Sequence, residues 1–262
     1  MKSTPKRPAR KLQLVKPAST NGRPLHPFDV GHGTETGGLI PAAQLLTGHP
    51  SDKHVTAYYG VAPSILRSLL DLWLHRTAPI SPIDRYTFLD IGAGKGRAML
   101  VAAESPFLEV VGVELNPTLA DIARRNIAIA VHHDLEIEIQ QLLSPIRLVQ
   151  GDALTLDLPE TPTLALLFHP FEAPLLRRFI RRIEARFATR PGHLDLLYIN
   201  AEHGAVFDRH PAFRQLWQGP VAMSTEDHIA DLREISEQAE YGSTGDELCA
   251  IYRYVGRSAG TY

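Results

Sequence analysis

The sequence predicts an α/β protein with a doubly wound, Rossmann-like, mostly parallel sheet that carries helices on both faces. Three observations predict this fold class. From Tyr86 onward, short apolar runs alternate with segments of helical periodicity, as in parallel sheets covered on both sides. One run ends in an acid followed by three alternating glycines and a helix, over residues 88–104. Hydrophobic residues make up 44% of the 262 residues and charged residues 21%, which suffices for a sizeable core.

Two segments precede this alternating part. Residues 1–25 are rich in Pro, Lys and Arg without periodicity, so we expect a disordered basic tail. Residues 26–85 are expected to form a lid loop followed by a helix. The apolar stripe of residues 64–76 predicts that helix, with Ser64 as its N-cap. The main domain is expected to span residues 86–262.

Six strands and three helices are predicted along this domain. Asn116 and Pro117 suit the cap and the first position of the second helix. Residues 135–144 suit either a strand or a short helix, and both alternatives stay open. The predicted strands cover residues 86–91, 109–115, 146–153, 163–168, 193–200 and 248–256, and the predicted helices cover residues 95–104, 116–131 and 172–187.

The net charge of −2 hides an asymmetry along the chain. Residues 1–28 carry seven bases and no acid, so the remainder has 20 bases against 29 acids and a net charge of −9. A dedicated nucleic-acid binder would have a basic folded domain, so nucleic acid is a possible but disfavoured partner. Six arginines between residues 177 and 190 predict a solvated helix face, with phosphate contacts to RNA or DNA as the alternative.

Other classes of protein are disfavoured by what the chain lacks. No apolar run approaches the ~20 residues that span a bilayer, so no membrane partner is expected. The single cysteine, Cys249, permits no intramolecular disulfide and favours a cytoplasmic protein. The twelve histidines form no H-x-x-x-H or H-E-x-x-H pattern, so no metal site is predicted.

The loop from Asp90 to Arg97 is the candidate ligand-binding segment. Glycine lets the backbone approach a ligand and adopt positive φ, and ligands of doubly wound folds collect at the carboxyl ends of the strands. A phosphate-binding P-loop would need Ser or Thr after Lys95, where Gly96 stands. A dinucleotide fingerprint would need Gly or Ala in place of the bulky Arg97, which makes a nicotinamide-dependent oxidoreductase the weaker alternative.

The remaining pattern, G-x-G-x-G preceded by Asp, resembles motif I of class I S-adenosylmethionine-dependent methyltransferases. The resemblance implies seven strands with the last antiparallel, and S-adenosyl-L-methionine as cofactor. It also implies that Glu114, at the end of the second strand, accepts the ribose hydroxyls, and that Asp152 and Ala153, after the third, meet the adenine. The cofactor-binding residues expected from it are Asp90, Gly92, Ala93, Gly94, Gly96, Glu114, Asp152 and Ala153.

The resemblance covers roughly residues 26–256. It is strongest to a group of uncharacterised bacterial class I methyltransferases with an HPFD…TGG stretch, here residues 26–29 and 36–38, and a DxGxGKGR loop, here residues 90–97. The loop is distantly similar to that of the seven-strand histone lysine methyltransferases. Residues 168–171 are Phe-His-Pro-Phe where the family pattern has Asn-Pro-Phe, so the class of substrate stays open.

The acceptor side has weaker signals. His169 follows the fourth strand, where the resembled enzymes place the acceptor, and a neutral imidazole there accepts a proton. It is the candidate catalytic base, and Asp29 and His32 are further proton acceptors. The candidate substrate-binding residues are Phe171, Asn200, Glu202 and Tyr59, and Tyr58 is expected to close with Tyr59 over the methionine moiety.

The predicted function is therefore methyl transfer from S-adenosylmethionine to an unidentified acceptor. A small molecule or a protein side chain is the favoured acceptor. A non-catalytic regulatory module that binds the same cofactor is the alternative from another class of protein.

Overall fold

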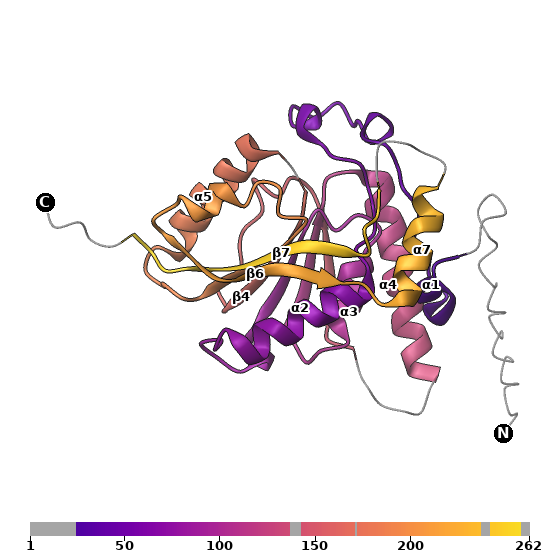
Figure 1. The fold of residues 1–262 in the computed structure, drawn as a ribbon, viewed down its shortest axis with the longest axis horizontal. Coiled ribbons are helices and arrows are strands. Elements are labelled where there is room, and N and C mark those ends of the chain that lie inside the picture. Colours follow the sequence, from indigo (N-terminus) through magenta and orange to yellow (C-terminus); the bar gives the residue numbers. More distant parts are fainter. Residues whose placement is uncertain (1–24, 137–142, 171, 237–241, 258–262) are drawn as a thin grey trace, which may run out of the picture.

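The computed structural model describes residues 25–136, 143–170, 172–236 and 242–257. Its centre is a seven-stranded sheet in the order β3-β2-β1-β4-β5-β7-β6 (Figure 1). β7 runs antiparallel to both of its neighbours, and β1 to β5 pair in parallel, which confirms the predicted sheet. The strands are β1 (Thr87–Ile91), β2 (Glu109–Glu114), β3 (Ile146–Gln150), β4 (Thr163–Phe168), β5 (Leu194–Ile199), β6 (Phe213–Ala222) and β7 (Asp246–Tyr254).

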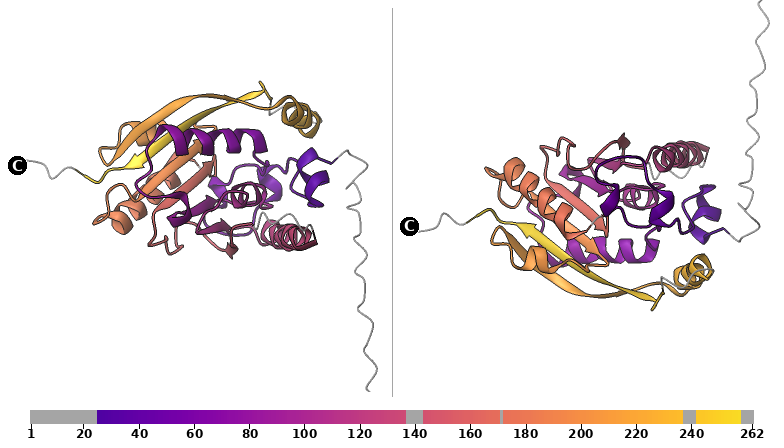
Figure 2. Two further views of the ribbon diagram at one scale, coloured as in Figure 1. Left: turned by 90° about the horizontal axis from the view of Figure 1, so that it is seen from below. Right: turned by 90° about the horizontal axis from the view of Figure 1, so that it is seen from above.

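Helices cover both faces of the sheet (Figure 2). Helices α2 (Pro63–Arg76) and α3 (Arg97–Ala103) belong to the apolar core of one face, and α5 (Ala173–Phe187) belongs to that of the other. The short helix α1 lies between α4 and α7 and contacts both. The remaining helices are α1 (Pro27–His32), α4 (Pro117–Glu136), α6 (Ala205–Asp208) and α7 (Thr225–Ile235), and three 3-10 turns are η2 (Ala42–Gln44), η3 (Asp52–His54) and η4 (Ile83–Arg85).

Of the two predicted helix N-caps, Asn116 is confirmed and Ser64 is wrong. Asn116 caps α4 as predicted, because its Oδ1 accepts from the backbone N–H groups of Thr118 and Leu119 at 2.9 and 3.1 Å. The N-cap assigned to Ser64 is wrong, because α2 begins at Pro63. Proline suits this first position, where its missing N–H costs nothing.

Ser64 instead joins α2 to α7. Its backbone N–H donates to Asp227 Oδ2 at 2.7 Å, and its hydroxyl accepts from the backbone of Ser224 at 2.9 Å. Ser224 in turn caps α7, since its hydroxyl accepts from the backbone N–H of Asp227 at 3.1 Å.

Helix α4 continues to Glu136 and so accounts for the start of the segment left open, while residues 137–142 lie outside the described residues. In the described parts of the chain, none of the helices combines the length and the apolar character needed to cross a bilayer.

Candidate functional site

Three glycines shape the loop between β1 and α3. Gly92, Gly94 and Gly96 have φ values of 79°, 55° and 89°, in the left-handed region where a side chain strains the backbone. The N–H groups of Gly92 and Ala93 both donate to the carbonyl of Val113 at 3.0 and 2.9 Å, which ties the loop to β2. A Cβ atom added to Gly94 would lie 2.2 Å from Cε2 of Tyr58. The glycines therefore let the loop pass close to other groups without clash.

Two buried carboxylates end β1 and β2 beside this loop. Glu114 accepts from the backbone N–H groups of Gly94 and Asn116, both at 2.7 Å, and burial raises its pKa above the usual value. Asp90 is 3% exposed, and its Oδ2 atom has no hydrogen-bond partner among the described residues. Burial, with the Glu114 carboxylate nearby, raises the pKa of Asp90 to about 7. Such an unpartnered buried carboxylate calls for a ligand that supplies a donor.

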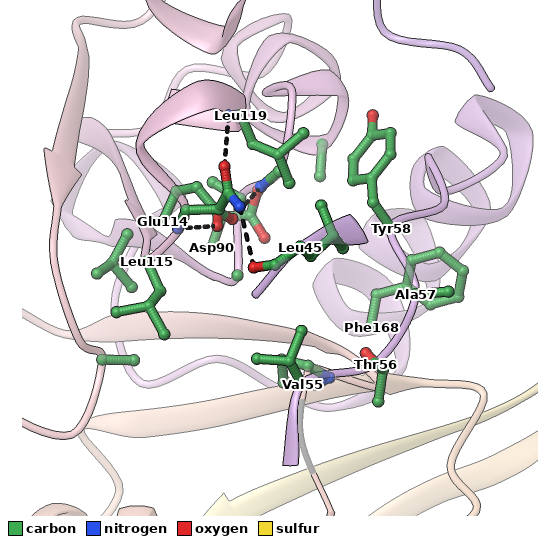
Figure 3. A pocket seen from close by; sticks show the side chains of 18 of the residues that line it. Leu45, Val55, Thr56, Ala57, Tyr58, Asp90, Glu114, Leu115, Leu119 and Phe168 are labelled. Carbon is green, nitrogen blue, oxygen red and sulfur yellow. Dashed lines mark hydrogen bonds between the residues drawn. The ribbon is translucent and has the colours of Figure 1, made fainter. Parts of the chain in front are cut away.

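A pocket separates these carboxylates from residues 36–61, which we name the strap (Figure 3). Leu45, Val55 and Tyr58 of the strap face Asp90 and Glu114 across it. The pocket lining also includes Gly92, Ala93, Gly94, Tyr59, Asp152 and Ala153, so seven of the eight predicted cofactor residues border one space. The eighth, Gly96, is the N-cap residue of α3, and its backbone packs against Ala123.

The strap is attached to the carboxyl ends of the strands along its length. Asn116 Nδ2 donates to the carbonyl of Leu45 at 3.1 Å, and Thr56 Oγ1 donates to the carbonyl of His169 at 2.9 Å. Two histidines of the strap approach carboxylates: the His49 Nε2 atom lies 3.9 Å from Asp152 Oδ2, and the His54 Nδ1 atom lies 2.8 Å from Glu172 Oε2. The strap thus roofs the pocket.

Tyr58 closes the strap over the glycine loop. Its hydroxyl donates to the carbonyl of Thr36 at 2.6 Å, and the ammonium of Lys95 lies 5.3 Å from the centre of its ring. Burial raises the pKa of this phenol far above its usual range, so it stays a neutral donor.

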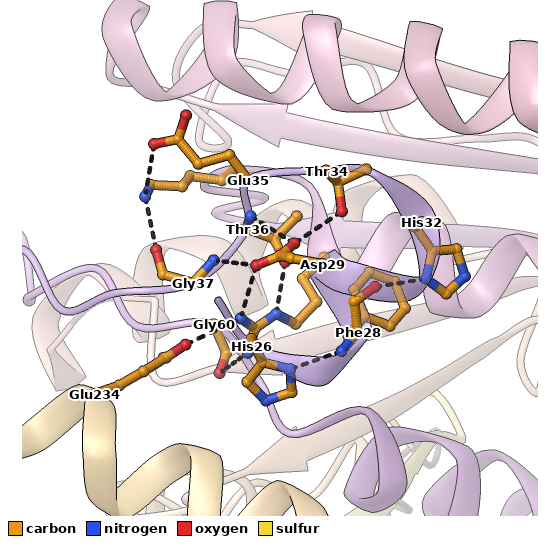
Figure 4. Close-up of polar contacts among 12 residues, drawn as sticks. His26, Phe28, Asp29, His32, Thr34, Glu35, Thr36, Gly37, Gly60 and Glu234 are labelled. Atoms are coloured by element: carbon orange, nitrogen blue, oxygen red, sulfur yellow. Dashed lines mark hydrogen bonds and ion pairs between the residues drawn. The ribbon is translucent and has the colours of Figure 1, made fainter. Parts of the chain in front are cut away.

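Asp29 holds the start of the strap, together with the basic residues of the glycine loop (Figure 4). Its carboxylate accepts from the hydroxyls of Thr34 and Thr36 and from the backbone N–H groups of Thr36 and Gly37, at 2.7–2.9 Å. Arg97 Nε donates to Thr36 Oγ1 at 2.8 Å, and Lys95 Nζ donates to the carbonyl of Gly37 at 2.7 Å. The HPFD…TGG and DxGxGKGR stretches therefore form one structural unit.

The guanidinium of Arg97 is buried in this unit. It lies 3.8 Å from an oxygen of Asp29 and 3.5 Å from Glu234 Oε1 of α7, and its NH1 donates to the carbonyl of Gly60 at 3.2 Å. Sequence reasoning missed the contribution of Lys95, Arg97 and Glu234 to the site. It also missed Asn126 of α4, whose Nδ2 donates to the carbonyls of Glu35 and Lys95 at 3.0 and 2.9 Å. The only signal was a lysine and an arginine placed directly against a glycine loop.

Asp29 and His32 were also predicted as proton acceptors. The Asp29 carboxylate is occupied by the hydrogen bonds above, and His32 Nδ1 bonds the carbonyl of Phe28 at 2.8 Å. Neither residue borders the pocket. Their contacts hold α1 and the strap in place.

The predicted acceptor residues gather after β4 and β5. His169 Nε2 lies 3.7 Å from Glu202 Oε2, its ring centre lies 5.4 Å from that of His203, and Asn200 Nδ2 donates to Glu202 Oε1 at 3.4 Å. His169 and Asn200 both have positive φ, 44° and 50°, so the backbone leaves the strand conformation at both positions. His169 itself does not border the pocket, whereas its neighbours Phe168 and Pro170 do.

The two remaining predictions for this side concern Phe171 and metals. Phe171 lies outside the described residues. Within residues 25–136, 143–170, 172–236 and 242–257, no group of three or more His, Cys, Asp or Glu side chains is placed to hold a metal ion.

Comparison with known proteins gives one match by sequence family. Residues 89–183, from β1 into α5, match the family model of a methyltransferase domain. No curated protein matches the chain.

Solved structures similar to this one include three methyltransferases. An RNA methyltransferase from Salinibacter ruber in complex with S-adenosyl-L-homocysteine is 18% identical, covers 76% of this chain and 94% of its own, and has a TM-score of 0.39. A precorrin-6y C5,15-methyltransferase from Geobacter metallireducens is 14% identical, with coverages of 71% and 88% and a TM-score of 0.43. A ribosomal protein L11 methylase from Lactobacillus delbrueckii is 14% identical, with coverages of 72% and 79% and a TM-score of 0.41.

Proposed function

We propose that the pocket under the strap holds S-adenosylmethionine, and that the acceptor of its methyl group enters beside the ends of β4 and β5. Residues 89–183 match the family model of a methyltransferase domain, which supports an S-adenosylmethionine-dependent methyltransferase. The observation that carries the proposed placement is the buried, unpartnered Asp90 Oδ2 beside three left-handed glycines. A cationic amino group, such as that of the methionine moiety, is the partner that this carboxylate lacks.

Each cofactor residue has a distinct role in this proposal. Asp90 would hold the amino group, and Glu114 would accept the ribose hydroxyls. In the structure Glu114 Oε2 accepts from the backbone of Gly94 and Oε1 accepts from that of Asn116, and a carboxylate has about four acceptor sites, so capacity remains for this purpose. Asp152 and Ala153 would contact the adenine. When bound, S-adenosylmethionine supplies a methyl group that is already activated by its sulfonium.

The chain's own residues would then orient the acceptor and exclude water. We propose His169 as the base that takes a proton from a hydroxyl or amine of the acceptor, with Asn200, Glu202, Phe171 and Tyr59 as acceptor contacts. We propose that residues 26–85 form a lid loop and a helix in front of the 86–262 domain, with the strap as the lid, because it roofs the pocket. The contacts of Arg97 with Asp29 and of Lys95 with Gly37 support assigning the HPFD…TGG and DxGxGKGR stretches to one family pattern. The buried free thiol of Cys249 supports a cytoplasmic location.

The affinity for cofactor is expected to depend on pH through Asp90. Its pKa is raised to about 7, and only the ionised carboxylate attracts an amino cation. Affinity should therefore rise with pH, by roughly eightfold between about pH 6 and pH 7.5, as the carboxylate loses its proton. Calorimetric titration with S-adenosylhomocysteine, which carries the same amino group, measures this rise.

Two variants give this titration its controls. Asp90→Asn should bind more weakly and show no rise with pH. Asp84→Asn, at an exposed position in η4, should behave as the wild type. A pH-independent wild-type affinity, or an Asp90→Asn variant with wild-type affinity, would contradict the placement of the amino group.

Glu114→Gln tests the ribose end of the pocket. The substitution keeps the size of the side chain but removes the charge and one acceptor oxygen. Hydrogen bonds to a charged group are worth ~1.5–3 kcal/mol, so affinity should fall about tenfold to a hundredfold. Glu109→Gln, at the opposite end of β2, is the matched control and should leave the affinity for the cofactor unchanged. A loss of less than about twofold in Glu114→Gln would exclude the ribose contact.

Transfer of labelled methyl separates the enzyme from its alternatives. Small molecules, peptides and RNA are offered as acceptors with labelled S-adenosylmethionine. A regulatory module would bind the cofactor and label none of them, and a nicotinamide-dependent oxidoreductase would instead change NADH fluorescence on titration.

A further inference from the structure

Helix α5 carries more net positive charge than any other helix that the structure describes. Five arginines lie within it and Arg190 follows its end, whereas Glu184 is its single acid. Glu184 is already engaged, since Arg257 Nε donates to its Oε1 at 2.7 Å and His210 Nε2 lies 3.8 Å from its Oε2. The helix therefore has no acid of its own left to neutralise its arginines.

Three of these arginines hold the loop of residues 154–160 against the helix. Arg182 donates to the carbonyl of Leu156, and Arg190 donates to that of Glu160. Arg186 donates to the carbonyl of Leu158 at 2.9 Å and pairs with Glu160 Oε1 at 2.9 Å. Their placement is thus explained by the fold.

The other three, Arg177, Arg178 and Arg181, are exposed and have no hydrogen bond or ion pair in the part of the chain that the structure describes. Like charges four residues apart on a helix repel, and Arg177 stands in that relation to Arg181. On an ordinary solvent-exposed helix face, positively and negatively charged side chains alternate. The face formed by these three arginines carries only positive charges. A bound anion would offset the repulsion.

A groove runs between this helix and the loop that it holds. Four guanidiniums and two carboxylates face it, and one of those carboxylates, Glu160, is paired with Arg186. The Nε atom of Arg182 is buried there without a partner among the described residues. The groove is lined by Leu154, Asp157, Leu158, Glu160, Arg178, Arg181, Arg182, Ala185 and Arg186. Leu154 also lines the pocket under the strap, so the two adjoin.

We propose that this groove and the free arginines beside it bind the phosphodiester backbone of a nucleic acid. A guanidinium forms two parallel hydrogen bonds with a phosphate, and Arg rather than Lys supplies every base of this face. The free arginines stand on successive turns, with a rise of roughly 6 Å between Arg177 and Arg181, which suits a chain of phosphates better than a single anion. The inference goes beyond the proposed function, because this binding needs no cofactor.

Fluorescence anisotropy with labelled single-stranded RNA and DNA of one sequence, without S-adenosylmethionine, tests this proposal on the full chain. The triple variant Arg177→Ala/Arg178→Ala/Arg181→Ala keeps the three arginines that hold the loop. Its affinity should fall at least about tenfold, and the slope of log affinity against log salt should shrink by about 2, for three lost contacts at ~0.7 each. The matched control is Arg125→Ala/Arg209→Ala/Arg214→Ala, which removes three exposed arginines outside α5 and should bind as the wild type.

Each outcome decides the proposal. An equal loss in both triple variants, or none in either, overturns it. Ultraviolet crosslinking should place the nucleic acid on residues 173–190, and crosslinks confined to residues 1–28 overturn it. The proposal is also overturned if the oligonucleotides do not bind and the protein instead binds phosphatidylserine vesicles through these arginines. Which of the two oligonucleotides, RNA or DNA, binds more tightly then identifies the nucleic acid that this face prefers.

Discussion

Gly94→Val is expected to abolish binding of S-adenosylhomocysteine, with a loss of affinity beyond about a hundredfold, or ~2.7 kcal/mol. Valine at a φ of 55° strains the backbone, and its Cβ would lie 2.2 Å from the ring of Tyr58. The loop and the strap cannot then both keep their places around the pocket. Calorimetry measures the affinity, and a thermal melt shows that the variant is folded.

The control for this variant is Gly31→Val in α1, where an added Cβ meets nothing within 4 Å. It should keep wild-type affinity. Combining Gly94→Val with Tyr58→Ala removes the overlapping ring, and partial recovery would identify that ring as part of the cause. A folded Gly94→Val protein with unchanged affinity would remove the cofactor from this loop.

His169→Ala is expected to lower turnover by ~10²–10⁴-fold, the usual contribution of a general base, with cofactor affinity nearly unchanged. The side chain is 19% exposed and lies beside Glu202, and its Nδ1 has no partner among the described residues. If the imidazole accepts the proton, the wild-type rate should rise with pH along a limb that vanishes in the variant. A loss without a change in pH profile would reduce His169 to a positioning role.

Steady-state rates with the acceptor found in the labelled-methyl screen provide the measurement. His75→Ala, at an exposed position of α2 that does not line the pocket, is the matched control. Wild-type turnover in His169→Ala would return this residue to a structural role and leave Asn200 and Glu202 as candidates.

The core of the fold was predictable because its signals are local. Buried parallel strands such as 87–91 and 163–168 are mostly apolar in sequence, and the cap at Asn116 depends on two residues that follow it closely. α7 was not predicted, and β6 was not located along the sequence, although the resemblance implied a seventh strand. β6 lies at the edge of the sheet, has a register shift between Gln215 and Trp217, and contains a glycine and a proline, so it shows no clean alternation. For α7, Ser224 and the acids that follow it were a usable start signal.

In the candidate site, too, the parts with local signals were predictable from the sequence and the parts that depend on distant contacts were not. The glycine loop and the acids that end β1 and β2 are adjacent to recognisable strands, and the pocket brings them together. The roof depends on contacts between distant residues, such as Tyr58 with Gly94 and Leu45 with Asn116, which no local pattern encodes. For Arg97 the sequence predicted only an obstacle to dinucleotide binding, whereas its partners come from residues 29, 36, 60 and 234.

The ion cluster around Arg97 has a consequence for biosynthesis. Its acids lie on both sides of it in the chain, Asp29 long before and Glu234 long after. A ribosome adds ~5–20 residues per second, so Arg97 leaves it roughly ten seconds before Glu234 is made. During that interval the nascent chain holds a cation whose final counter-charge does not yet exist. The contact between Arg97 and α7 therefore forms only after α7 has been translated, later than the residues of the strap that contact Arg97 become available.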